Sequence, residues 1–66
     1  MYRDKHGRVW YVDRFSDRHP GYAVWFRNRE GVPTCAWEIT GRGASYEEAL
    51  SALRRLARRQ RDWEAI

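Results

Sequence analysis

The segment that begins at Ser45 carries the strongest structural signal in the sequence. Residues Ser45–Glu48 (Ser-Tyr-Glu-Glu) have the spacing of a capping box, in which serine and glutamate each bind a free backbone N–H group at a helix start. Apolar side chains then recur at the spacing of one helix face, and Trp63 continues this stripe. The acidic first turn and the arginines that follow both suit the helix dipole. The sequence therefore predicts an amphipathic helix over residues 45–64.

Three segments before this helix favour β-strands, because β-branched and aromatic residues are concentrated in them. Turn-forming residues separate the segments, which are Arg8–Phe15, Tyr22–Asn28 and Thr34–Thr40. Residues 1–7 are polar and are expected to form an N-terminal tail. With 66 residues the chain is long enough for a single domain. The predicted fold class is α+β, with a three-stranded antiparallel sheet over residues 8–40 packed on one C-terminal amphipathic helix (β-β-β-α).

One helix can cover only one face of such a sheet, so the other face meets water or a partner. Side chains alternate between the two faces along each strand, and the more apolar set is expected beneath the helix. The first segment is ambiguous, and we place Tyr11 inside because the alternative buries two arginines. The expected inner set is Val9, Tyr11, Phe15, Tyr22, Val24, Phe26, Cys35, Trp37 and Ile39.

The opposite, open face is the candidate binding surface. Its predicted residues are Arg8, Trp10, Arg14, Trp25, Arg27 and Arg29. The chain has a net charge of +4, and Lys5 is the only lysine among its 13 basic residues. Arginine matches phosphate and carboxylate geometry and stacks on aromatic rings, so an anionic partner is expected. The sequence leaves open the alternative that the tryptophans pair across the strands while the arginines only solvate them.

A second basic surface is expected on the outer side of the helix. Its residues point away from the apolar stripe and are Arg54, Arg55, Arg58 and Arg59. This charge run is either a solvated helix face or a second contact to phosphates or to an acidic partner.

No catalytic or metal chemistry is predicted. His6, His19 and Cys35 fit no zinc-binding spacing, and the carboxylates are scattered without paired geometry. We therefore expect no cofactor, no metal and no enzymatic activity. The sequence contains no signal peptide and no membrane-spanning segment, so no membrane partner and a cytoplasmic location are expected.

Two resemblances add to this interpretation. The strand-strand-strand-helix order, with arginine and tryptophan on the open sheet, resembles the arm-site DNA-binding domain of tyrosine-recombinase integrases and is similar to the plant ethylene-response-factor type. That resemblance implies a sheet that lies in the major groove of DNA, backed by the helix. Locally, Pro33–Cys35 followed by Gly43–Leu50 (Gly-Ala-Ser-Tyr-Glu-Glu-Ala-Leu) is similar to HicB-type antitoxins, which implies a protein partner that the domain blocks.

Two functional hypotheses follow, and the sequence leaves both open because a cationic surface serves either partner. The first is a small non-enzymatic protein that binds double-stranded DNA through its open sheet face. The second is a protein-binding inhibitor, antitoxin-like or a phage-type anti-CRISPR, that blocks a nucleic-acid-processing enzyme or complex. The sequence does not predict an oligomeric state.

Overall fold

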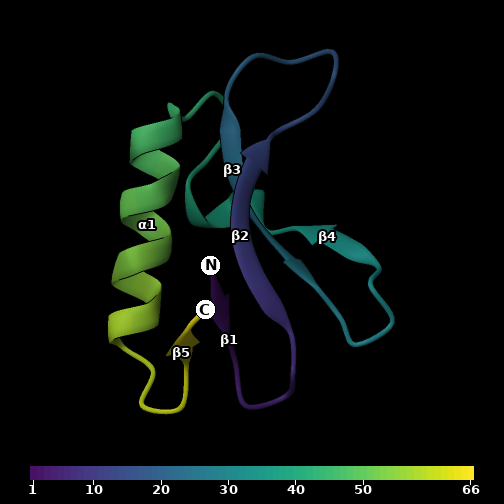
Figure 1. Cartoon of the computed structure of the whole chain (residues 1–66). Helices are drawn as coiled ribbons and strands as arrows, with labels where there is room; N and C mark the ends of the chain where they lie inside the picture. Colours follow the sequence, from purple (N-terminus) through teal and green to yellow (C-terminus); the bar gives the residue numbers. More distant parts are fainter.

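The computed structural model describes residues 1–66 and confirms a small α+β fold, in which one α-helix packs on one face of an antiparallel sheet (Figure 1). The sheet has five strands rather than the three predicted, in the spatial order β4-β3-β2-β1-β5. In chain order the elements are β1 (Tyr2–Arg3), β2 (Val9–Arg14), β3 (Tyr22–Arg27), β4 (Pro33–Cys35), the 3-10 helix η1 (Trp37–Ile39), α1 (Tyr46–Arg58) and β5 (Glu64–Ala65).

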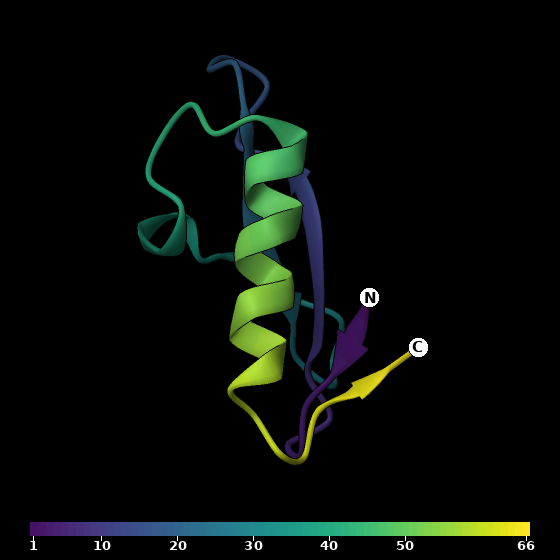
Figure 2. The ribbon, with the colours of Figure 1, turned by 90° about the vertical axis from the view of Figure 1, so that its left-hand side faces the viewer.

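The two additional strands come from the ends of the chain. In β1, Tyr2 pairs with Trp10 of β2 on one side and with Ala65 of β5 on the other. The two chain ends therefore lie side by side at this edge of the sheet (Figures 1 and 2). The prediction of a polar tail over residues 1–7 is wrong, because Tyr2 and Arg3 form a strand. A strand of two residues is too short to show an alternating pattern in the sequence.

Helix α1 begins with the predicted capping box. The backbone N–H of Glu48 donates to Ser45 Oγ at 3.1 Å, and the backbone N–H of Ser45 donates to Glu48 Oε1 at 2.9 Å. The helix ends at Arg58, earlier than predicted, because the chain turns there to bring Glu64 beside β1. Trp63 therefore lies outside the helix, although its ring still packs on the hydrophobic core.

The third predicted strand, Thr34–Thr40, is correct only as far as Cys35. The chain then continues as η1, whose Trp37 and Ile39 side chains are both 40% exposed. Cys35 pairs directly with Trp25, so its side chain lies on the face away from α1 and not in the predicted core position.

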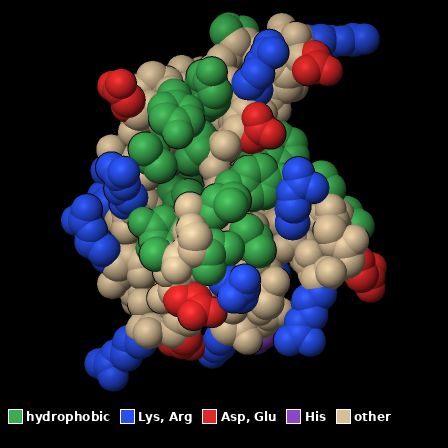
Figure 3. All heavy atoms as spheres, viewed as in Figure 1, with side chains coloured by type: hydrophobic (Ala, Val, Ile, Leu, Met, Phe, Trp, Pro, Cys, Tyr) green, Lys and Arg blue, Asp and Glu red, His purple; other side chains and the backbone are tan.

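The core lies between α1 and the strands β2 and β3. Its buried residues are Trp10, Val24, Ala36, Ala52 and Leu53, and Tyr2, Val12, Phe26, Leu56 and Trp63 pack against them. The prediction that β2 turns Val9 and Tyr11 toward the helix is wrong, because Trp10 is 8% exposed and pairs with Phe26. The core is not fully covered at its edge, where hydrophobic side chains remain visible between the helix and the strands (Figure 3).

A buried carboxylate fixes this orientation of β2. The Asp4 side chain, 1% exposed, lies in the turn between β1 and β2. Its Oδ2 atom accepts hydrogen bonds from Trp10 Nε1 at 2.9 Å and from Arg8 Nε at 2.6 Å. Its Oδ1 atom accepts the backbone N–H groups of His6 and Arg8, both at 2.9 Å. Both oxygens are therefore satisfied, and the Trp10 indole is held on the helix side of the sheet.

The same carboxylate pairs with Arg8, the residue before β2, so this arginine does not oppose the inward orientation of Trp10. The Arg8 guanidinium pairs with Asp4 and lies 5.6 Å from the Trp10 ring centroid and 5.3 Å from that of Phe26. Arg14 ends the strand and remains exposed. Neither arginine is therefore buried without a partner, and Trp10 can point inward without the cost of an unpaired buried charge.

We expect Leu53→Ala to destabilise the fold by about 2–5 kcal/mol, because it opens a cavity at the centre of the core. Leu53 is 1% exposed and belongs to the buried set beneath β2 and β3. Urea unfolding followed by far-UV circular dichroism measures this change. Arg54→Ala, at the next and exposed position, is the control, and an equal midpoint for the two variants would contradict the core assignment.

Asp4 gives a second stability prediction. Burial alone raises the pKa of Asp4, but the hydrogen bonds from Trp10, Arg8 and His6 outweigh it and lower the pKa from 3.8 to about 2. Since the folded pKa lies below the unfolded one, the carboxylate stabilises the fold fully above about pH 4, and this contribution is lost as the pH falls through about 2.

Asp4→Asn places an amide nitrogen opposite donors and should cost about 2–3 kcal/mol at neutral pH. Urea unfolding at neutral pH and near pH 2 measures the effect, with the exposed Asp13→Asn as the matched control. The difference between wild type and Asp4→Asn should shrink at the lower pH. A difference that stays constant over this range would contradict a stabilising role for the Asp4 charge.

Candidate nucleic-acid interface

The open face of the sheet is built from β2, β3 and β4. The strand register places Tyr11 directly opposite Trp25, and Trp25 directly opposite Cys35. Val9 and Arg27 form the next pair on the same face. Trp25 and Arg27 thus lie on the open face as predicted, and they are joined there by Tyr11, which the sequence analysis had placed inside.

The Trp25 indole lies across the sheet. Its Nε1 atom donates to the backbone carbonyl of Arg14 at 3.2 Å. Because this acceptor belongs to the main chain of β2, the ring extends over the neighbouring strand instead of standing upright from β3. Trp25 is half-buried, so part of its ring surface remains open to a ligand.

Arg27 adds a positive charge beside the Tyr11 ring. Its guanidinium carbon lies 5.2 Å from the centroid of the Tyr11 ring, a cation–π contact, and its Nη1 atom donates to the carbonyl of Gly31 at 3.4 Å. The side chain is exposed and oriented by both contacts. Tyr11, Trp25 and Arg27 occupy neighbouring positions on the open face, and this group is named here the aromatic platform.

The other predicted residues are divided between the margins and the opposite face. Arg14 lies at the end of β2 and is exposed. Arg29 lies in the loop after β3, where its Nε atom donates to the carbonyl of His6 at 3.1 Å. Arg8 and Trp10 belong to the helix side and take part in the Asp4 network, so the structure does not bring them to the open face.

Four arginines of α1 and its C-cap, named here the basic face of α1, flank the helix: Arg55 and Arg59 lie on the side of η1, and Arg54 and Arg58 lie on the side of β1. Arg54, Arg55, Arg58 and Arg59 are all exposed. None of these four takes part in an ion pair, since the three ion pairs of the structure are Arg3–Glu64, Lys5–Asp62 and Arg8–Asp4. Their spacing creates like-charged pairs four residues apart, and each such pair destabilises a helix by about 0.2–0.5 kcal/mol.

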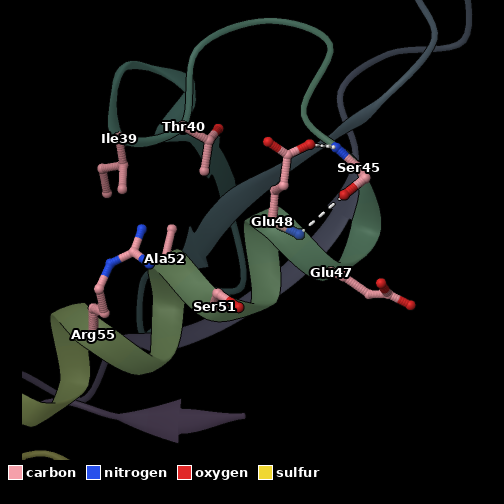
Figure 4. A pocket seen from close by; sticks show the side chains of 8 residues that line it. All are labelled: Ile39, Thr40, Ser45, Glu47, Glu48, Ser51, Ala52 and Arg55. Atoms are coloured by element: carbon pink, nitrogen blue, oxygen red, sulfur yellow. Dashed lines mark hydrogen bonds between the residues drawn. The ribbon is translucent and has the colours of Figure 1, made fainter.

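An open groove separates α1 from η1 (Figure 4). Ile39 and Thr40 line one wall, and Ser51 and Ala52 lie on the helix side. Arg55 extends from the helix toward Ile39 in the close-up view (Figure 4). The Glu48 carboxylate at the far end of the groove is already engaged by the capping box, so it is not a free group for chemistry.

The structure also describes the cysteine and the residues that commonly bind metals. Burial raises the pKa of the Cys35 thiol, so the uncharged thiol is favoured. No group of three or more histidine, cysteine, aspartate or glutamate side chains is placed to hold a metal ion. The structure also contains no helix of the length and apolar character needed to cross a membrane.

Comparisons with known proteins found no match for this chain among protein-family models, curated proteins or solved structures. The two surfaces that bear on function are the aromatic platform and the basic face of α1.

Proposed function

We propose that the protein binds nucleic acid through its open sheet face, and that it favours single-stranded segments. One observation carries this proposal: Tyr11 and Trp25 occupy directly opposed positions on the open face, and the Arg27 guanidinium lies 5.2 Å from the Tyr11 ring centroid. Flat aromatic rings on a sheet stack against bases, and a neighbouring arginine neutralises the phosphate that follows.

The expectation from the sequence alone was double-stranded DNA, read by arginines of the sheet. That expectation used six residues, of which Trp25 and Arg27 lie on the open face. A surface with two aromatic rings and one arginine suits stacking more than the reading of base edges, which needs several hydrogen-bonding side chains. Stacking requires bases whose faces are free, and this favours a single strand over a duplex.

A protein partner is the second candidate, and a separate observation favours it. Two large hydrophobic side chains are exposed together at the β1–β5 edge, Met1 at 66% and Ile66 at 48%, where the backbone N–H of Ile66 donates to the Met1 carbonyl. Hydrophobic side chains are also visible between α1 and the strands (Figure 3). An inhibitor of a nucleic-acid-processing enzyme could use such a surface together with its arginines to cover an acidic, partly apolar site.

The proposal is tested by fluorescence anisotropy with a labelled single strand and with a duplex of the same sequence, each at two salt concentrations. We expect tighter binding of the single strand. Trp25→Ala should lower the affinity about 5- to 150-fold, the loss of about 1–3 kcal/mol of stacking. Arg27→Ala should flatten the slope of log affinity against log salt by about 0.7, the loss of one phosphate contact on a single strand.

Matched controls separate these effects from general loss of charge or of an aromatic ring. Trp37→Ala removes an exposed tryptophan outside the platform, and Arg18→Ala removes an exposed arginine of the loop between β2 and β3. Neither control should change single-strand affinity by more than about twofold. Absence of single-strand binding at low salt, or equal losses in Trp37→Ala and Trp25→Ala, would overturn the proposal and leave the protein partner as the candidate.

A further inference from the structure

The basic face of α1 and the aromatic platform lie on opposite sides of the molecule. Helix α1 packs on one face of β2 and β3, as the two ribbon views show, and the platform belongs to the other face (Figures 1 and 2). The whole chain has extents of 32 × 25 × 18 Å. A ligand seated on the platform therefore leaves the arginines of α1 free.

Charge pairing within the fold does not account for these arginines. From Arg54 to Arg61 the sequence contains five arginines and no acidic residue. Like charges four residues apart repel along a helix, whereas the helix dipole favours the arginines of the last turn and the C-cap, Arg55, Arg58 and Arg59. No acidic side chain pairs with the four arginines of the basic face in the structure. A surface that repels itself and lacks internal partners suits an external polyanion.

The chemistry of this surface differs from that of the platform. The segment from Arg54 to Arg61 contains no aromatic residue, so it offers guanidinium groups without a ring on which a base could stack. Such a surface suits phosphates, which arginine binds in a bidentate manner and without regard to sequence. Duplex DNA presents the densest row of these charges, about one per 1.7 Å of helix axis.

We infer that the protein bridges two nucleic-acid segments: a single strand on the aromatic platform and the phosphate backbone of a duplex on the basic face of α1. This inference rests on the proposed function for its first half, whereas the duplex contact stands on the helix arginines alone. A short duplex cannot occupy both sides of one molecule, because DNA stays nearly straight over lengths far below its persistence length of about 150 base pairs.

A ternary capture experiment tests the bridge. A biotinylated duplex of about 20 base pairs, short compared with its persistence length, is immobilised on beads. A fluorescent oligothymidine of about eight nucleotides is added with the protein. This length lies within the range of about 4–16 nucleotides that one OB fold, also a small β domain, binds. The duplex contains no adenine run, so the strand does not pair with it. We expect the wild-type protein to bring the fluorescent strand to the beads in a salt-sensitive manner.

Two variants test the duplex contact and the single-strand contact separately. Arg55→Ala/Arg59→Ala should lose capture and flatten the salt slope of duplex binding by about 1.8, two phosphate contacts at about 0.9 each. It should still bind the strand in solution, and alanine keeps the helix intact because its helix propensity is high. Trp25→Ala should lose capture of the strand while it still binds the duplex. Arg18→Ala/Arg42→Ala, which removes two exposed arginines elsewhere, is the charge-matched control and should retain capture.

The outcomes distinguish the bridge from the proposed function. Strand binding in solution without capture on duplex beads would overturn the bridge and leave the proposed function standing. Absence of strand binding in solution would overturn both. Equal loss of capture in the Arg18→Ala/Arg42→Ala control would show that only total charge matters, and it would overturn the assignment to α1.

Discussion

The hydrogen bond from the Trp10 indole to the buried Asp4 carboxylate sets the orientation on which the rest of the structure depends. With Trp10 Nε1 at 2.9 Å from Asp4 Oδ2, the indole is fixed on the helix side of β2. Because neighbouring side chains of a strand point to opposite faces, an inward Trp10 places Tyr11 outward, where it meets Trp25. One buried interaction in a turn thereby determines which aromatic residues form the core and which form the candidate interface.

Much of this fold follows from local patterns in the sequence. The capping box at Ser45, the apolar stripe of the helix and the alternation of β3 are all local, and the structure confirms each of them. The missing parts depend on contacts between residues far apart in the chain. Strands β1 and β5 pair with each other across almost the whole sequence, and each has only two residues. No pattern within so short a segment can predict such a pairing.

The error in β2 has a different physical origin. From the sequence alone, an inward arginine is expected to be a buried, unpaired charge, which is costly. Arg8 instead finds the Asp4 carboxylate at the edge of the core and spreads over the Trp10 and Phe26 rings. The available signal was the spacing of Asp4 and Arg8 around a turn, four residues apart. Two of the three platform residues, Trp25 and Arg27, are predictable from alternation, whereas Tyr11 is not.

The indole N–H groups of Trp10 and Trp25 report whether the β2 orientation set by Asp4 presents Tyr11 and Trp25 to a nucleic-acid ligand. The measurement is a nuclear magnetic resonance titration of 15N-labelled protein with a short oligothymidine. We expect the chemical shifts of the Trp25 indole N–H and of the Tyr11 and Arg27 amides to change on addition of the oligothymidine. The chemical shift of the Trp10 indole N–H should stay constant. A shifting Trp10 signal with an unchanged Trp25 signal, or no shift at any of these groups, would contradict this expectation.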